Sequence, residues 1–193
     1  MALGGPIAAH GALRTIGVFS SSPIETFDEY HATDARSSLP VLNGAGLVTI
    51  PPGTGSVKLE FSSQLGTDLV TPISGMMMGQ LGIMDWTFTT PIRRFGAFIE
   101  NNSGKDGGTA FFYDAADNLL GSLEVSALAK AQKWTWNGWE SDTPFKRIQV
   151  VGNGLINGFL WYENVRVSEI PNGSTVMLIM AGLPVTWRRR RVS

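Results

Sequence analysis

The sequence predicts an all-β fold, an antiparallel β-sandwich, for the greater part of the chain. Two observations support this class. The 193 residues include 23 Gly and 10 Pro, and long amphipathic helical periods are few, a composition typical of turn-rich β proteins. Short runs that alternate apolar and polar residues are separated by turn-forming clusters at spacings of about 8 to 15 residues, as in sandwiches built from hairpins.

The chain divides into three parts by composition. Residues 1–12 are small and apolar and have no basic start, so we expect the remnant of a signal peptide or a disordered leader. Residues 13–169 carry the alternating pattern and are long enough for one domain with its own core. Residues 170–193 form a C-terminal tail of different composition, for which we expect a short hydrophobic helix or anchor.

The first predicted strands lie at 57–61 and 95–99. In each segment every second residue is apolar, which places the apolar side chains on one face of an extended strand. Turn-forming residues precede the first segment, and the Asn- and Gly-rich residues 101–108 follow the second and predict a loop.

The second half of the domain predicts a hairpin and two further strands. Residues 109–113 and 119–125 alternate on either side of an Asp- and Asn-rich turn and predict a β-hairpin. A short helix is expected at 126–133. Strands are expected at 145–151 and 159–167, because Gly- and Asn-containing turns separate them.

The C-terminal tail combines a hinge, an apolar run and a basic end. Apolar residues dominate 176–187, and Arg188, Arg189, Arg190 and Arg191 follow. Four arginines without partners must stay in water or at lipid headgroups, so the pattern predicts a membrane-associated tail with its basic end on the cytoplasmic side. The alternative is a buried terminal strand with a solvated basic tip, because apolar runs of this length also occur in cores.

The tail resembles the PEP-CTERM sorting signal of bacterial surface proteins. Pro171 matches the first proline of that motif and Ser174-Thr175 match the residues that follow it, whereas Asn172 and Gly173 replace the Glu and the second Pro. The resemblance implies an exosortase-type processing enzyme and inner-membrane lipid as partners. It also implies export through the inner membrane to the cell surface or extracellular matrix.

Residues 141–167 resemble the closing strands of the jelly-roll domains found in such proteins. This resemblance implies a jelly-roll-like sandwich with a structural or carbohydrate-binding role, and exopolysaccharide as a partner. It also implies a structural calcium ion where the first and last strands meet, with Glu25, Asp28 and Glu163 as its ligands, since carboxylates suit a hard cation. The alternative is that the three carboxylates are surface charges on edge strands.

Charge and cysteine content exclude several classes. The net charge of −1 becomes −5 without the four terminal arginines, and no basic patch carries interleaved aromatic residues, so nucleic-acid binding is not expected. The chain has no Cys, which excludes disulfides, thiol catalysis and Cys-based zinc sites.

Aromatic residues supply the candidate binding surface. Trp134 and Trp136 are two residues apart and fall on one face of an extended strand, and a bulge at Gly138 could bring Trp139 to the same side. Indole rings beside Asn and Glu suit sugars, because the ring stacks on C–H groups while polar neighbours bind hydroxyls. The same three tryptophans could instead form the core of the sandwich.

Catalytic patterns are sparse. His10 lies in the leader, which leaves His31 within the acidic segment 25–34 as the one imidazole of the domain. Met76-Met77-Met78 favours packing or a loop over a copper site. We therefore expect no enzymatic activity. The competing hypotheses are a polysaccharide-active enzyme, whose carboxylates the sequence does not pair, and a soluble β domain without export.

Overall fold

The computed structural model describes residues 12–31, 35–52, 59–62, 71–102, 105–152 and 159–169. These residues form twelve strands, and one 3₁₀ turn is the helical segment among them. In chain order the elements are β1 (Leu13–Thr15), β2 (Ile24–Glu25), β3 (Ala35–Arg36), β4 (Ser38–Val41), η1 (Leu42–Gly44), β5 (Gly46–Thr49), β6 (Leu59–Ser62), β7 (Met77–Leu81), β8 (Ile83–Asn101), β9 (Gly108–Tyr113), β10 (Leu119–Val125), β11 (Thr135–Gly152) and β12 (Phe159–Glu169).

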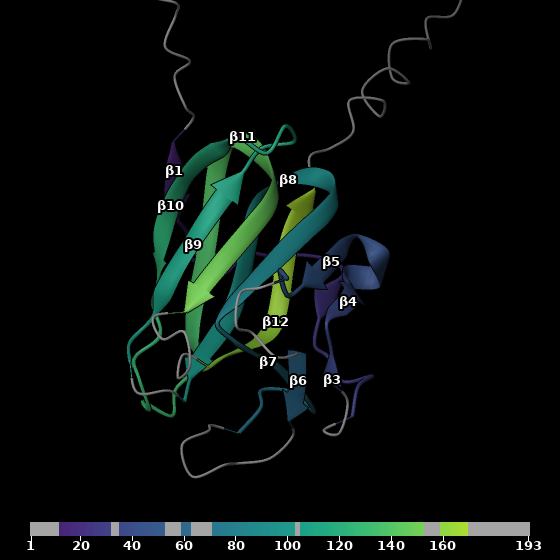
Figure 1. The fold of residues 1–193 in the computed structure, drawn as a ribbon, viewed down its shortest axis with the longest axis vertical. Helices are drawn as coiled ribbons and strands as arrows, with labels where there is room; N and C mark the ends of the chain where they lie inside the picture. The colour runs from purple at the N-terminus through teal and green to yellow at the C-terminus, as the bar shows by residue number, and fades with distance from the viewer. Residues whose placement is uncertain are drawn as a thin grey trace, which may run out of the picture.

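The strands form two packed layers because β8 and β11 are long enough to run through both (Figure 1). One layer, here called the β9 layer, has the order β10-β9-β11-β8-β5-β4 and uses residues 145–152 of β11 and 83–88 of β8. The other, the β12 layer, has the order β1-β11-β8-β12-β7-β6-β3 and uses the remaining halves of the same two strands. β2 pairs with Val165 and Arg166, in the C-terminal half of β12. All of these pairs are antiparallel, as the sequence predicts.

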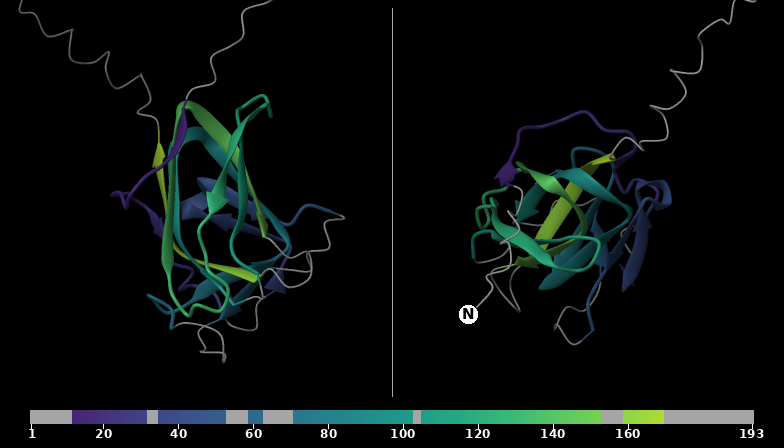
Figure 2. Two further views of the ribbon diagram at one scale, coloured as in Figure 1. Left: turned by 90° about the vertical axis from the view of Figure 1, so that its left-hand side faces the viewer. Right: turned by 90° about the horizontal axis from the view of Figure 1, so that it is seen from above.

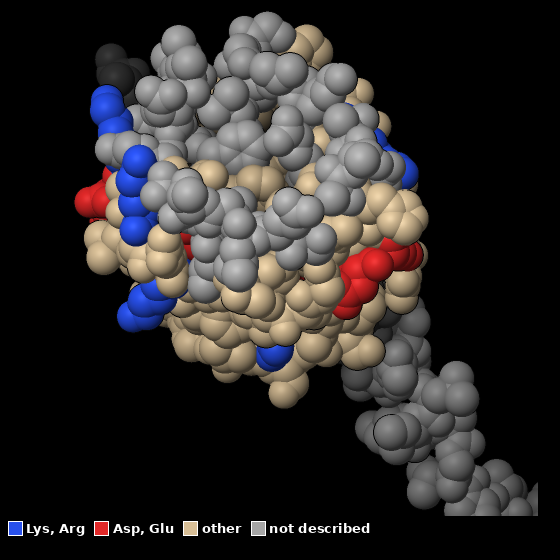
Figure 3. Space-filling model, turned by 90° about the horizontal axis from the view of Figure 1, so that it is seen from below, with Lys and Arg blue, Asp and Glu red and all other residues tan. Residues whose placement is uncertain are grey.

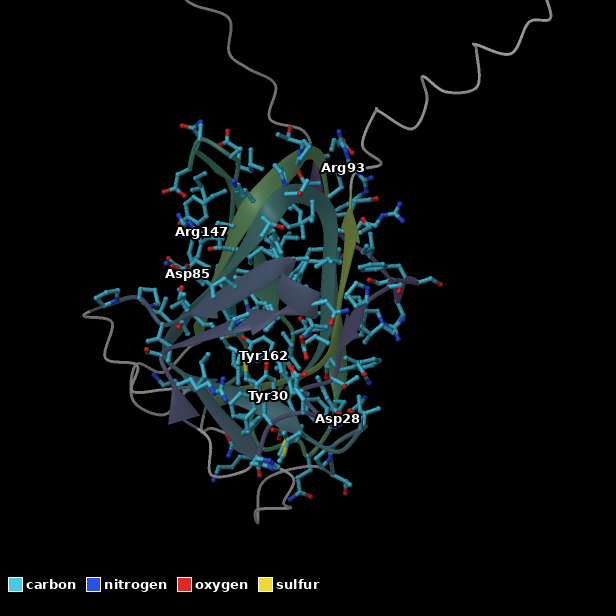
Figure 4. The ribbon with its side chains drawn as sticks, turned by 90° about the vertical axis from the view of Figure 1, so that its right-hand side faces the viewer. Asp28, Tyr30, Asp85, Arg93, Arg147 and Tyr162 are labelled. Carbon is cyan, nitrogen blue, oxygen red and sulfur yellow. The ribbon has the colours of Figure 1, made fainter. Side chains whose placement is uncertain are left out.

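The bend between the layers contains the prolines of the two long strands. Pro91 lies in β8 and Pro144 in β11, and the register between these strands becomes irregular between Glu140 and Arg147. Proline donates no ladder hydrogen bond, so it is tolerated where pairing is interrupted. Arg93, at one end of the molecule in Figure 4, donates to backbone carbonyls of β11 in the bend.

The core between the layers is rich in aromatic rings. Trp86 from the β9 layer contacts Tyr162 from the β12 layer, with ring centroids 5.7 Å apart, and Phe112 contacts Trp139 across the same gap at 5.5 Å. Phe95 stacks on Trp139 with an interplanar angle of 9°. These rings are almost fully shielded from solvent, so their burial is a major stabilising contribution to the fold.

Several sequence predictions are confirmed. The predicted hairpin is present as β9 and β10, and the predicted strands at 95–99, 145–151 and 159–167 lie within β8, β11 and β12. Phe95, Ala97 and Ile99 are buried, as the alternation predicts. Of the predicted strand 57–61, residues 59–61 lie in β6, and 57–58 fall outside the described residues.

The predicted helix at 126–133 is wrong. This segment is an irregular connection between β10 and β11. Lys130 and Gln132 have φ angles of 53° and 49°, which a right-handed helix does not contain. The side chain of Asp106 accepts a hydrogen bond from Ala129 N at 2.6 Å and the backbone of Asn101 accepts one from Lys130 N at 2.8 Å. The connection therefore satisfies its amides through distant partners rather than through helical bonds.

The methionine run belongs to the fold. Met77 and Met78 lie in β7 and are fully buried, and Met76 is nearly so. Packing, one of the two roles favoured by the sequence, is therefore the role of these residues.

The predicted leader, apart from Ala12, and the predicted tail at 170–193 lie outside the described residues. Within the described ranges, no helix has both the length and the apolar character needed to cross a membrane. β1 and the C-terminal end of β12 lie at the same end of the sandwich, beside the bend (Figures 1 and 2).

Candidate functional site

The three candidate tryptophans separate between the two sides of the β12 layer. The ladder from Thr135 to Glu140 pairs with β8 without interruption, so Gly138 makes no bulge and the residues simply alternate. Trp139 therefore points into the core, where it is 1% exposed. Our expectation that a bulge could bring Trp139 beside the other two indoles is wrong, and the alternative of core packing holds for this residue.

Trp136 points outward and packs under an N-terminal segment. Its ring contacts Phe98 at 5.1 Å and Phe19 at 5.9 Å, and its Nε1 donates to Ile16 O at 3.1 Å. A Cβ added at Gly96 or Gly138 would lie 2.3 or 2.4 Å from atoms of this indole, so the ring lies directly against the backbone of both strands. The residues around 16–19 thus cover Trp136.

Trp134 forms a hydrogen bond with a second segment, residues 71–76, that lies over the β12 layer. Its Nε1 donates to Thr71 O at 2.9 Å. Residues 71–76 then pass over the same layer, where Trp161 is 5% exposed although it lies on the outer side of β12. The parts of the outer face of the β12 layer around Trp136 and Trp161 are therefore covered by the chain itself.

The three candidate calcium ligands bind backbone amides. Glu163 is fully buried and accepts hydrogen bonds from Ile73 N, Ser74 N and the Ser74 hydroxyl. Asp28 accepts one from Met76 N at 2.9 Å. Glu163 and Asp28 thus hold the segment 71–76 in place.

Glu25 makes the same kind of contact elsewhere. It accepts from Leu42 N at 2.7 Å and from Phe27 N at 3.2 Å. Among the described residues, no three His, Cys, Asp or Glu side chains lie close enough together to hold a metal ion. The structure therefore shows Glu25, Asp28 and Glu163 as anchors of the backbone and does not assemble them into a ligand set. His31 is exposed.

A pocket of about 270 Å³ lies beside Glu25, Asp28 and Glu29. Figure 4 shows Asp28 in the lower part of the molecule, near Tyr30. Burial raises the pKa of Glu25 above its ordinary value of 4.5, and the nearby carboxylates of Glu29 and Asp28 contribute in the same direction, while its backbone hydrogen bonds oppose the shift.

This raised pKa predicts a pH dependence of stability. A carboxyl group whose pKa is higher in the folded state than in the unfolded state adds to the free energy of unfolding. This contribution is complete at pH values below the unfolded-state pKa and is lost as the pH rises through the folded-state pKa. We expect the free energy of unfolding of the wild type to fall relative to that of Glu25→Gln as the pH rises above about 4.5. Urea unfolding at several pH values measures this, and a difference that does not change with pH would contradict it.

The outer face of the β9 layer is different, because its side chains are accessible. Residues of β9, β11, β8 and β5 alternate between the core and this face. The ladder register aligns the outward residues in rows across the strands, and we call two of these rows the β9 face: Tyr113, Arg147, Thr87 and Leu47 form one, and Phe111, Gln149, Asp85 and Thr49 form the other. All eight are partly or fully exposed.

A polar network lies at the centre of the β9 face. Arg147 donates from Nη1 to Asp85 at 3.2 Å and from Nη2 and Nε to Asp117 at 2.7 and 2.9 Å. Gln149 Nε2 donates to the same Asp85 oxygen at 3.1 Å. Figure 4 shows Arg147 and Asp85 side by side at one edge of this view. The side chains of Arg147 and Asp85 are 21% and 16% exposed, so the network is held in place and still reaches solvent.

Aromatic rings flank this network at the β9 end. The guanidinium carbon of Arg147 lies 3.6 Å from the ring centroid of Tyr113, a close cation–π contact. Phe111 occupies the same position in the second row. Asp117 belongs to the turn between β9 and β10, so the hairpin positions one partner of Arg147 and the sheet positions the other.

The β9 face is not evident from the sequence. The alternation of 109–113 and 145–151 shows which residues share a side of each strand, but the register that places Arg147 opposite Tyr113 and Thr87 depends on long-range pairing. The pattern Phe111-Tyr113 beside Arg147-Gln149 was the available signal.

Charged side chains elsewhere form small groups. Seen from below in Figure 3, acidic and basic residues are scattered and no continuous basic surface is visible on the described part of that side.

No family model matches the chain, and no curated protein matches it. Solved structures share part of the fold. An arabinose-bound α-L-arabinofuranosidase of glycoside hydrolase family 51 is 11% identical with a TM-score of 0.44, over 64% of this chain and 23% of that one. A family 43 arabinoxylan arabinofuranohydrolase from Bacillus subtilis is 18% identical with a TM-score of 0.38, over 60% and 25%.

A family 29 carbohydrate-binding module from Piromyces equi is 10% identical with a TM-score of 0.37, over 60% of this chain and 81% of the module. The chain therefore matches about a quarter of the length of the two enzymes and most of the module. At these identities the likeness concerns the fold.

Proposed function

We propose that this protein is an exported, non-catalytic β-sandwich that binds carbohydrate on the β9 face. The observation that carries the proposal is the pair of accessible rows in which Tyr113 and Phe111 flank the fixed polar group of Arg147, Gln149 and Asp85. Residues 16–19 and 71–76 contact Trp136, Trp134 and Glu163 on the opposite outer face, whereas the outward side chains of the β9 face reach solvent.

The two kinds of side chain suit the two kinds of surface that a sugar presents. An aromatic ring packs against the C–H groups of a sugar ring, and amide, carboxylate and guanidinium groups bind its hydroxyls. Oδ1 of Asp85 accepts the hydrogen bond from Arg147 and also the one from Gln149, whereas Oδ2 accepts neither of them. Because the network is already ordered without a ligand, binding loses less side-chain entropy than it would on a flexible surface.

Removal of one flanking ring is expected to weaken binding. Phe111→Ala deletes a ring that makes no contribution to the Arg147 network, and the loss of one stacking contact, about 1 to 1.5 kcal/mol, corresponds to about a tenfold weaker affinity. Affinity electrophoresis in gels containing glucomannan or mixed-linkage β-glucan measures the change. Leu128→Ala, at a 65% exposed position outside this face, is the matched control and should migrate like the wild type.

Two results would contradict the proposed function. If no neutral polysaccharide slows the migration of the wild type, the protein does not have the proposed binding role. Release of reducing ends during incubation with these polysaccharides would instead support the alternative of a polysaccharide-active enzyme.

The proposal includes the cellular setting implied by the tail. Pro171, Ser174 and Thr175, the apolar residues 176–187 and the terminal arginines support sorting through the inner membrane to the cell surface or matrix. The test is fractionation of cells that express the gene with its upstream sequence: recovery in the membrane and surface fractions is expected, and recovery in the cytoplasm alone would contradict export.

A further inference from the structure

We infer that the β9 face binds the interior of neutral, unbranched polysaccharide chains, with at least three consecutive sugar units lying across the strands. This inference rests on the proposed function and adds the class of ligand and its mode of binding. It follows from the shape, the length and the charge of the two rows.

The sheet continues beyond both ends of each row. Leu119 and Ser122 of β10 lie beyond Tyr113 and Phe111, Pro40 and Ser38 of β4 lie beyond Leu47 and Thr49, and all four are exposed. The eight residues come from four adjacent strands, and the row that starts at Tyr113 ends at Leu47, which is 40% exposed. The pocket beside Glu25 is lined by residues 23–29 and 42–43 and does not include residues of the β9 face. A surface of this kind admits a chain that continues beyond both edges, whereas recognition of a chain end needs a closed pocket.

The distance from β9 to β5 sets the smallest number of sugar units that contact both ends of the β9 face. Three inter-strand spacings separate β9 from β5. At about 4.8 Å each they span about 14 Å, roughly the length of three sugar rings placed end to end. An aromatic ring lies at one end of each row and the hydrogen-bonding groups lie in the middle, so a single sugar would use only part of the surface.

The charges favour a neutral chain. The guanidinium of Arg147 is already bound by the carboxylates of Asp85 and Asp117, and one positive charge thus faces two negative ones. A uronic acid would have to displace a carboxylate from Arg147 and would meet repulsion from the other. Hydroxyl groups, which can donate to a carboxylate and accept from an amide, suit the same network without this conflict.

The experiment is calorimetric titration of the full chain with gluco- and manno-oligosaccharides of one to six units. We expect no measurable binding of the monosaccharides, an increase of at least tenfold in affinity between two and four units, and little further gain at six. Oligogalacturonates of the same lengths should bind at least tenfold more weakly than the better neutral series.

Variants locate the ligand. Arg147→Ala should lower the affinity for the hexasaccharide at least tenfold, whereas Arg36→Ala, which removes a guanidinium 5.2 Å from the ring of Tyr30, should leave it unchanged. Gln149→Ala is the second variant in case Arg147→Ala folds poorly, and it should weaken binding at least threefold.

The outcomes separate the two proposals. Absence of binding by every neutral oligosaccharide and polysaccharide would remove the proposed function itself. Monosaccharides that bind as tightly as hexasaccharides, or galacturonates that bind more tightly than neutral chains, would leave carbohydrate binding in place and overturn this inference. A dimer in sedimentation experiments that Arg147→Ala dissociates and Arg36→Ala leaves intact would also overturn this inference. A second copy of the chain would then occupy the β9 face.

Discussion

Trp139→Ala is expected to lower the free energy of unfolding by about 4 kcal/mol, because truncation of a buried large aromatic residue removes its burial and leaves a cavity. Trp139 is 1% exposed, stacks on Phe95 and contacts Phe112 from the opposite layer. Trp139→Phe keeps part of both contacts and should cost less. Urea unfolding followed by circular dichroism measures both changes.

The same variant distinguishes packing from ligand binding at this position. If Trp139 served a binding surface, its truncation would leave stability within about 0.5 kcal/mol of the wild type, as surface substitutions usually do. A decrease in the free energy of unfolding of less than about 0.5 kcal/mol would therefore contradict the core position of Trp139. Where Trp139→Phe remains folded, its affinity for glucomannan should equal that of the wild type.

Glu163→Ala is expected to lower the free energy of unfolding by about 3 kcal/mol, since buried donors that lose a charged acceptor are expensive to leave unpaired. The carboxylate is fully buried and accepts from two backbone amides and the hydroxyl of Ser74. Its loss should release the segment 71–76 from the β12 layer. Hydrogen exchange of the amides of Ile73 and Ser74 provides a local readout beside the global unfolding measurement.

Glu124→Ala is the matched control for this prediction. Glu124 lies in β10 and is exposed, so its truncation should change stability by less than about 0.5 kcal/mol. Two results together would show that the buried carboxylate does not hold the segment 71–76. The free energies of unfolding of Glu163→Ala and Glu124→Ala would be equal, and hydrogen exchange at Ile73 and Ser74 would be unchanged.

The local pattern of the sequence predicts much of the fold. Alternation at 95–99 and at 109–125 depends on neighbouring residues, and β8, β9 and β10 confirm it. The two-layer course of β8 and β11 is a long-range property, because it depends on which strands pair on either side of Pro91 and Pro144. The helix predicted at 126–133 fails for a similar reason, since distant acceptors hold Ala129 and Lys130.

The candidate site was harder to predict than the fold. The alternation of the sequence places Trp136 on the outer face of β11, and Trp134 precedes the strand. Whether that outer face is open depends on residues 16–19 and 71–76, which are far away in sequence. Glu163 likewise resembles a surface charge or a metal ligand in sequence, and becomes a backbone anchor only because residues 73–74 pass over it.

Backbone amide chemical-shift mapping by NMR during titration of the full chain with the best-binding neutral hexasaccharide tests the central claim most directly. We expect the largest perturbations on β9, on residues 145–152 of β11, on residues 83–88 of β8 and on β5, and we expect them to be clearly smaller in Phe111→Ala at the same subsaturating ligand concentration. Perturbations concentrated around Trp134 and Trp136 in the β12 layer, or at the pocket beside Glu25, would contradict the account and move the binding site to that surface.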